Sequence, residues 1–210
     1  GYVLAESLHH SIVSVYPALT ALKCKGSFFK AWAGVRTEGE ISLFTDGKFC
    51  KSERGELQLT EYGISGIPVF QISTYAVRAV REGHKAELRI NFMPELSEEE
   101  LRKLLYARKK ACPYKKEKEL LVGLFPEKLI KILISQKQVI SAIREFPLEV
   151  QDGMSFSQAQ VCSGGVDTTQ VNSQTMESKL CKGLYFAGEL LDIDGTCGGY
   201  NLQWAWSSGA

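Results

Sequence analysis

The most informative stretch of this sequence reads Asp192-Ile193-Asp194-Gly195-Thr196-Cys197-Gly198-Gly199-Tyr200-Asn201-Leu202-Gln203. It is a glycine-rich loop that runs directly into a helix predicted from Tyr200 to Ser208. The N-terminus of a helix exposes free N–H groups and the positive end of the helix dipole. Because Gly198 and Gly199 leave room for a ligand on these donors, the stretch predicts a site for an anion or for developing negative charge.

Two elements further upstream point to the same kind of site. Residues 161–166 form a predicted strand that ends in the paired glycines Gly164 and Gly165, which let backbone N–H groups approach a flat or anionic ligand. Residues 184–187 are predicted to be a short buried strand that delivers Glu189 at its C-terminal edge, where open α/β sheets bind ligands. Each element also has a simpler interpretation: a plain turn for the glycines and a solvated loop position for the acid.

These residues resemble the C-terminal signature of the BaiN-type FAD-dependent oxidoreductases, which are bacterial NAD(P)/FAD-dependent flavoproteins. The likeness continues upstream through Ser163-Gly164-Gly165-Val166 and Gly63-Ile64-Ser65-Gly66, and it is most specific over residues 161–210. The segments that carry it are Thr175-Met176-Glu177-Ser178-Lys179, Gly183-Leu184-Tyr185-Phe186-Ala187-Gly188-Glu189, Asp192-Ile193-Asp194-Gly195 and Gly198-Gly199-Tyr200-Asn201-Leu202-Gln203-Trp204-Ala205.

A more distant likeness, to flavoenzymes of the fumarate reductase type, implies roles for these residues. Glu189 would hold the ribityl hydroxyls, backbone N–H groups at the start of the last helix would meet the flavin carbonyl edge, and the paired glycines would line the flavin face. The implied FAD contacts are Gly164, Gly165, Gly188, Glu189, Asp194, Gly198, Gly199, Asn201 and Leu202. No residue is assigned as a catalytic acid or base.

The resemblance implies an enzyme that passes hydride from NAD(P)H through FAD to an unsaturated or carbonyl-containing small-molecule substrate. Two other classes of function stay open. A flavin-dependent RNA-modifying enzyme would use the basic run from Arg102 to Lys118 as its RNA contact. Interleaved glutamates and a scarcity of aromatic residues favour a solvated helical face there, so a nucleic-acid partner is not expected. The third class is a binding or assembly module without activity of its own.

The sequence departs from this family in one respect. Members carry a G-x-G-x-x-G turn that binds the FAD pyrophosphate, and that pattern is absent from these residues. We therefore expect a fragment, cut at both ends, that lacks the N-terminal half of the FAD domain. Such a chain alone is expected to be inactive and not to retain FAD, and its unpaired strand edges are expected to favour self-association.

The remaining pattern predicts an α+β fold. We expect a β-rich, barrel-like inserted domain with a helical appendage at residues 15–152. It would lie between the end of a first FAD-domain segment at residues 1–14 and a C-terminal FAD-domain segment at residues 153–210, which contributes strands and a helix. Asp46-Gly47 is typical of a hairpin turn, and Ser97 with Glu100 forms a capping box at the start of the appendage.

Individual elements follow from the period of the apolar residues. The predicted strands cover residues 12–15, 19–23, 39–44, 56–60, 86–92, 146–150 and 159–161. Five helices are predicted before the last one: an amphipathic helix at residues 1–8, residues 69–80, a helix beginning after Ser97 with Leu101, Leu104 and Leu105 on one face, one carrying Leu120, Leu121 and Leu124, and one beginning at Pro126 with Leu129, Ile130 and Leu133 on its apolar face.

Composition limits the other possibilities. A formal net charge of +1 gives no overall attraction to nucleic acid or membrane. No apolar run approaches the ~20 residues that span a bilayer, and no signal peptide is recognisable, so a cytoplasmic protein without a membrane partner is expected. The six cysteines form no C-x-x-C pair, and Asp192 and Asp194 have no nearby histidine. We therefore predict free thiols and no metal site.

Overall fold

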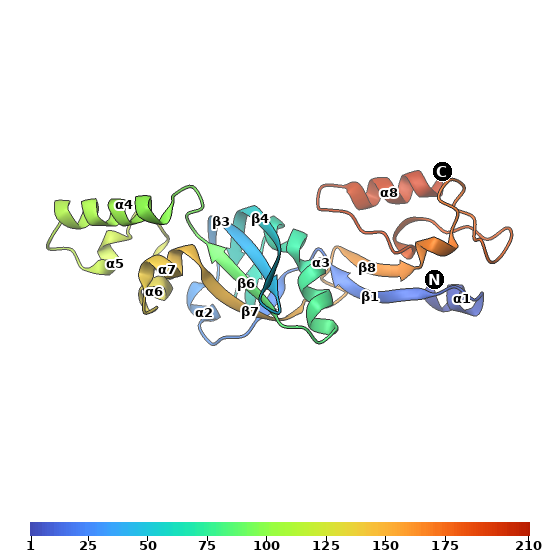
Figure 1. Cartoon of the computed structure of the whole chain (residues 1–210), viewed down its shortest axis with the longest axis horizontal. Helices are drawn as coiled ribbons and strands as arrows, with labels where there is room; N and C mark the ends of the chain where they lie inside the picture. The colour runs from blue at the N-terminus through green and yellow to red at the C-terminus, as the bar shows by residue number, and fades with distance from the viewer.

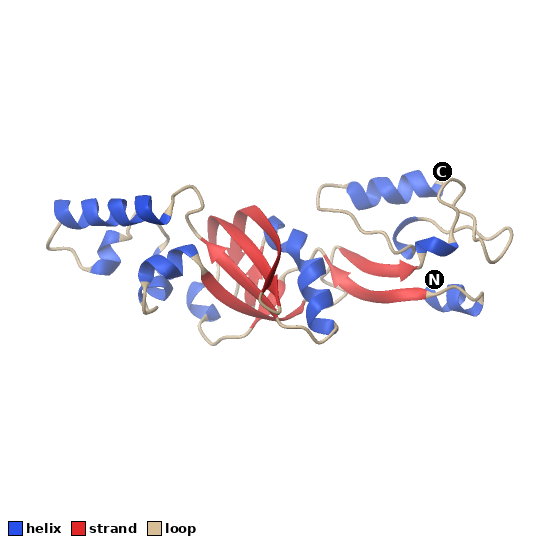
Figure 2. Ribbon diagram, in the orientation of Figure 1, coloured by secondary structure: helices blue, strands red, loops and turns tan.

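The computed structural model describes residues 1–210 as an elongated molecule with three parts (Figure 1). A β-barrel occupies the middle, a helical appendage of residues 97–145 lies at one end, and a terminal lobe lies at the other. The terminal lobe combines residues 1–18 with residues 161–210, so both ends of the chain meet in it. Figure 2 shows that the strands are concentrated in the barrel and in one ribbon of the terminal lobe.

Six strands close the barrel in the order β2-β5-β4-β3-β6-β7, and every neighbouring pair is antiparallel. The strands are β2 (Leu22–Cys24), β3 (Val35–Thr45), β4 (Lys48–Leu59), β5 (Gly63–Ser65), β6 (Ala86–Asn91) and β7 (Phe146–Gly153). The prediction of an α+β fold with a barrel-like β-rich part is confirmed. The predicted domain boundaries, after residues 14 and 152, stay a prediction.

The β3–β4 hairpin shows how local sequence sets this topology. Asp46 and Gly47 both have positive φ, 49° and 79°, which is the backbone of a two-residue turn whose twist matches the flanking strands. Side chains of β6 alternate along the strand, with Ala86, Leu88 and Ile90 buried. Closing the sheet leaves no free edge and surrounds a cluster of 32 buried residues, which extends into the appendage.

Two helices complete the barrel. The short helix α2 (Phe29–Trp32) places Trp32 among aromatic rings, and the Trp32 indole N–H donates to the Thr60 carbonyl at 3.1 Å. The long helix α3 (Ile67–Arg81) follows Gly66 and carries Pro68 in its first turn. It packs against β4 and β7 of the barrel and against β1 of the terminal lobe, and therefore joins the two parts.

The appendage contains α4 (Glu98–Ala111), α5 (Glu117–Leu120), α6 (Glu127–Ile134) and α7 (Val139–Arg144). The predicted capping box is present, because Ser97 Oγ accepts from the Glu100 N–H and the Glu100 carboxylate accepts from the Ser97 N–H. Leu129, Ile130 and Leu133 are buried as predicted. The predicted second helix is wrong beyond Leu120, because the chain leaves helical geometry before Gly123, which has a φ of 83°.

The terminal lobe is built on one antiparallel ribbon of β1 (Ile12–Ala18) and β8 (Val161–Val166). It also holds α1 (Tyr2–Ser7), the short 3₁₀ turns η1 (Thr168–Gln170) and η2 (Gly188–Leu190), and α8 (Tyr200–Gly209). A small cluster of five buried residues forms its core, and α8 buries none of its residues. The strand predicted at residues 184–187 is wrong: only Tyr185 bridges Glu177, because no neighbouring strand continues the pairing.

Buried polar groups of the terminal lobe are satisfied internally. His10 lies outside α1 and is buried, with Nε2 at 2.7 Å from the Ser178 hydroxyl and its ring edge-on to Phe186. The Ser178 oxygen in turn accepts from the N–H groups of Leu180 and Cys181. His10 therefore has a structural role, tying the beginning of the chain to its last third.

Candidate functional site

The glycine-rich loop and the start of α8 form an open set of backbone donors. Gly199 adopts a left-handed conformation with a φ of 90°, and no side chain caps the helix. The first helical bond runs from the Gln203 N–H to the Gly199 carbonyl at 3.0 Å. The N–H groups of Tyr200, Asn201 and Leu202 therefore have no carbonyl within the helix to bond. A side chain at position 199 would project into open space, so ligand approach is unobstructed there.

The Asn201 side chain closes the loop that precedes these donors. Its Oδ1 accepts from the Gly195 N–H at 2.7 Å, and its Nδ2 donates to the Gly195 carbonyl at 3.0 Å. Both ends of the amide are thus engaged within the loop. What Asn201 can offer a ligand from this conformation is its backbone N–H, while its side chain fixes the turn geometry.

A cavity of about 330 Å³ lies at this helix start. Its walls come from α8 and the glycine-rich loop, from η2, and from the two connections between the barrel and the β1–β8 ribbon. The lining residues are Leu19, Gln160, Val161, Glu189, Thr196, Cys197, Gly198, Gly199, Asn201, Leu202 and Ala205. Five of the nine residues predicted to contact a flavin are therefore gathered around one hollow.

Glu189 lies in η2 with an exposed side chain, and its carboxylate accepts a hydrogen bond from the Cys162 N–H at the start of β8. This bond holds η2 against the free edge of β8. Burial and the nearby Glu189 carboxylate raise the pKa of the Cys162 thiol. The pKa of the Tyr2 hydroxyl is also raised, mainly by burial and to a smaller extent by Cys162 and Glu189. Both groups stay neutral near pH 7.

Three of the predicted glycines, Gly164, Gly165 and Gly188, do not line the cavity. A side chain on Gly164 would come within 2.1 Å of the Ser14 carbonyl of β1, and one on Gly165 within 2.6 Å of the Leu190 carbonyl. Gly188 has a φ of 65° and donates its N–H to Ser208 Oγ at 2.8 Å. The close approaches seen here are to protein backbone and to α8, and a flavin contact by these glycines stays a prediction.

Asp194 also lies outside the lining of the cavity and is half-buried in the loop. No group of three or more His, Cys, Asp or Glu side chains has the geometry to hold a metal ion. All six cysteines are free thiols. None of the helices combines the length and the apolar character needed to cross a membrane.

Sequence reasoning missed the barrel's contribution to this site. Gln71 in α3 accepts a hydrogen bond from the Cys197 N–H through its side-chain oxygen at 3.1 Å, across 126 positions of sequence. Gln160 lines the cavity and accepts from the Cys197 thiol at 3.9 Å. Nothing in the local pattern of α3 marks Gln71, because its partner is set by the packing of two separate parts.

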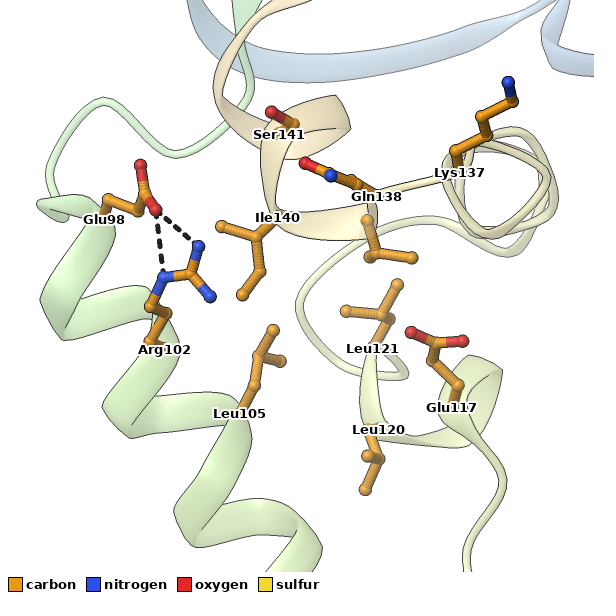
Figure 3. A pocket seen from close by; sticks show the side chains of 11 residues that line it. Glu98, Arg102, Leu105, Glu117, Leu120, Leu121, Lys137, Gln138, Ile140 and Ser141 are labelled. Atoms are coloured by element: carbon orange, nitrogen blue, oxygen red, sulfur yellow. Dashed lines mark hydrogen bonds and ion pairs between the residues drawn. The ribbon is translucent and has the colours of Figure 1, made fainter.

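A larger cavity of about 580 Å³ lies in the appendage between α4, α5 and α7 (Figure 3). Leucine and isoleucine side chains, among them Leu105, Leu121 and Ile140, line its inner side. Glu98 and Arg102 form an ion pair with a shortest separation of 2.6 Å on its rim. None of the predicted site residues reaches it. We place the candidate site at α8, where free donors, glycines and an acid converge.

Comparison with known proteins gives a family match along the whole chain. The sequence model described as the HI0933-like protein Rossmann domain matches residues 1–210. A 3-dehydro-bile acid delta(4,6)-reductase of Clostridium scindens is 41% identical to the chain, covering 100% of it and 55% of the relative.

Two ribosomal RNA dihydrouridine synthases are also similar. The protein from Haemophilus influenzae is 31% identical and the one from Escherichia coli is 34% identical, each match covering 99% of the chain. These matches cover 53% and 54% of the two relatives. The chain thus spans about half the length of the curated relatives it matches.

Proposed function

This chain belongs to the HI0933-like protein family, and from that membership we propose that it is part of an FAD-dependent oxidoreductase. The single observation that carries the proposal is the convergence of Glu189, Gly198, Gly199, Asn201 and Leu202 on one cavity at the uncapped start of α8. Free N–H donors at a helix start suit a group that gains negative charge when it is reduced.

The residues around the cavity fit a flavin. The N–H groups of Asn201 and Leu202 would face its carbonyl edge, and Glu189 would accept hydrogen bonds from the ribityl hydroxyls with the carboxylate oxygen that Cys162 does not use. When bound, FAD supplies the hydride chemistry, for which NAD(P)H is the proposed electron donor. The role of the chain is to bind and orient that group and to place positive dipole ends beside it.

The proposed substrate is an unsaturated or carbonyl-containing organic molecule. This class is supported by the relative named as a 3-dehydro-bile acid reductase, whose name specifies a delta(4,6) position. The barrel would cover the flavin from the substrate side, since α3 already reaches the glycine-rich loop through Gln71. No side chain at the cavity has the surroundings of a general acid or base, so the proposal names none.

The intact protein would add an N-terminal half that binds the FAD pyrophosphate and adenine. This proposal is supported by the length of the relatives and by apolar side chains that the terminal lobe leaves exposed: Val3, Leu4, Tyr185, Leu202 and Trp206. In this arrangement residues 1–14 and 153–210 belong to the FAD domain, and residues 15–152 are inserted between them.

Anaerobic reduction of the full-length protein tests the proposal. We expect the purified protein to be yellow, to lose its flavin absorbance on addition of NADH or NADPH, and to regain it with an enone acceptor. A full-length protein without bound flavin would contradict the proposal and favour a non-catalytic module. Flavin that is reduced but not reoxidised by any enone would contradict the proposed substrate class.

A second candidate is a flavin-dependent RNA-modifying enzyme. It is supported by the two relatives named ribosomal RNA dihydrouridine synthases and by the far end of the appendage. There Tyr106 and Tyr114 are exposed. Lys110 and Lys116 add charge, whereas Arg102 and Lys103 of the same region are neutralised by glutamates.

Salt-dependent binding of ribosomal RNA separates the two candidates. An RNA-modifying enzyme should bind more weakly as salt rises, and the replacement of Lys110 and Lys116 by Gln should reduce that salt dependence. The matched control is Arg102→Gln with Lys103→Gln, which removes two cations already paired with Glu98 and Glu99. RNA binding that is absent at low salt would exclude this candidate.

A further inference from the structure

We propose that Gln71 is a positioning residue that holds the glycine-rich loop of residues 195–199 in the geometry needed at the flavin. The inference rests on the proposed function, because it names a barrel residue that prepares the same site. Among hydrogen bonds to residues 195–210, the one from the Cys197 N–H to Gln71 Oε1, at 3.1 Å, is the only one that reaches the barrel.

The bond matters because of where Cys197 lies in the loop. Two residues before it, Gly195 is fixed by both ends of the Asn201 amide. One residue after it begins the Gly198-Gly199 turn, where both residues have positive φ, 120° and 90°. Glycines in these conformations have little intrinsic rigidity, so the turn needs anchors on its flanks. Gln71 supplies the anchor from the barrel side, and Asn201 supplies the one from the helix side.

The helix that carries Gln71 is itself firmly placed. Ile72 and Ala76 of α3 are fully buried in the barrel core. Two other side chains of α3 bond the region near the β1–β8 ribbon: Ser73 Oγ accepts from the Thr20 N–H at 3.0 Å, and Arg78 Nη2 donates to Ser163 Oγ at 2.9 Å. Gln71 thus projects from a rigid element onto a loop that has few contacts of its own. A motion of the barrel relative to the terminal lobe would be transmitted to the loop at Cys197.

The consequence for a bound flavin is electrostatic. The N–H donors of Gly199, Asn201 and Leu202 favour the reduced, negatively charged flavin only while they stay aimed at it. Loosening the loop lets these donors reorient, which lowers the affinity for reduced flavin more than the affinity for oxidised flavin. Gln71 would therefore tune the reduction potential without touching the reacting atoms.

Gln71→Leu in the full-length, flavin-loaded protein is the test, because leucine has similar size and no acceptor. We expect hydrogen exchange of the Cys197 amide to accelerate at least about tenfold. We expect reduced FAD to bind about tenfold more weakly relative to oxidised FAD, which lowers a two-electron potential by about 30 mV. Gln71→Glu keeps an acceptor for the Cys197 N–H, so it should keep slow exchange while its added negative charge lowers the potential.

Arg78→Ala is the matched control, since it breaks another bond between α3 and the terminal lobe without involving the loop. It should leave exchange at Cys197 unchanged, whereas equal effects in both variants would mean only that the interface was weakened and would overturn the proposal. Unchanged exchange and potential in flavin-loaded Gln71→Leu would also overturn it. Should Gln71→Leu not fold, fast exchange of the Cys197 amide in Gln71→Glu overturns it instead, because that variant keeps the acceptor. A protein without flavin in any variant contradicts the proposed function itself.

Discussion

The barrel closes six strands on one another around a cluster of 32 buried residues, whereas the terminal lobe pairs only β1 with β8 and gathers five. A closed barrel pairs every strand edge, whereas the outer edge of β8 in the two-stranded ribbon is held only by a bridge between Val166 and Leu191 and by the bond from Cys162 to Glu189. The helix α8 buries none of its residues, while α3 buries seven. The barrel is therefore stabilised mainly by its own core, whereas the terminal lobe has a small core and depends more on contacts with other parts of the protein.

The residues that carry the proposed chemistry lie in the less self-sufficient part. Free N–H donors, glycines with positive φ and an exposed acid are features that a tightly packed core excludes, because unpaired polar groups are costly when buried. The barrel contributes rigidity through α3, and the lobe contributes an open surface. If this division is correct, substitutions in the barrel should change stability, and substitutions in the lobe should change ligand binding.

The largest expected effect is on the barrel. Trp32 is 0% exposed, and Trp32→Ala removes its packing and leaves the Thr60 carbonyl without its donor. We expect the free energy of unfolding to fall by about 3–5 kcal/mol. Trp206 of α8 is 67% exposed, and Trp206→Ala should change stability by less than about 0.5 kcal/mol. Urea unfolding of both variants, followed by circular dichroism, measures the difference, and similar losses would contradict the comparison.

The next largest effect concerns FAD binding by the chain alone. We propose that the cavity at α8 contacts only the ribityl and isoalloxazine end, and that the pyrophosphate site of the family lies outside these residues. We expect the 210-residue chain to bind FAD at least about a hundredfold more weakly than the full-length protein, a difference of about 2.7 kcal/mol. Titration of FAD with detection by flavin fluorescence measures both affinities. Tight stoichiometric quenching by the chain alone would show that the cofactor is carried differently.

A smaller effect is expected at Glu189 in the full-length protein. Loss of a hydrogen bond to a charged group costs about 1.5–3 kcal/mol, so Glu189→Ala should weaken FAD binding by roughly 10- to 150-fold. The matched control is Glu177→Ala, because Glu177 also accepts a backbone N–H, that of Gly183 at 2.8 Å, but does not line the cavity. Equal losses of FAD in both variants would indicate a general weakening of the lobe and would remove Glu189 from the proposed site.

Local features of the fold were predictable, and features that need a distant partner were not. The Asp46-Gly47 turn and the Ser97 capping box are decided by residues a few positions apart, and the structure has both. The strand predicted at residues 184–187 fails because a strand exists only where another strand pairs with it. The hydrophobic pattern of the second predicted helix of the appendage continues past Leu120. The helix itself ends there, since Gly123 takes a left-handed conformation.

For the candidate site, the residues could be predicted from the sequence, but the hydrogen bonds that hold them in place could not. Glu189, Gly198, Gly199, Asn201 and Leu202 were found from residue type and family likeness, and they line one cavity. The bidentate bond between Asn201 and Gly195 could not be foreseen, since the amide also suits a ligand. The contact of Gln71 with Cys197 was equally hidden, because it depends on how two parts of the chain pack. The likeness to BaiN-type flavoproteins is confirmed at the level of the family.

The smallest expected effect is a pH dependence at the exposed hairpin of the barrel. The Asp46 carboxylate accepts from the Lys85 N–H at 2.9 Å and contacts His84 Nδ1 at 2.8 Å. These bonds, the backbone one first, lower the pKa of Asp46 below its ordinary value of 3.8. The stabilisation from a depressed pKa is fully present above the unfolded-state pKa and is lost as the pH falls through the folded-state value. Asp46→Asn keeps an acceptor for the Lys85 N–H and tolerates the left-handed turn, so it removes only the charge. We expect the urea midpoint of Asp46→Asn to lie slightly below that of the wild type at pH 6 and to converge with it as the pH falls below 3.8.

In the terminal lobe Asp167, whose pKa is lowered by bonds from Thr169, provides the matched substitution. Asp167→Asn should leave the barrel transition unchanged at every pH, and a shift as large as that of Asp46→Asn would mean that the two parts unfold as one unit.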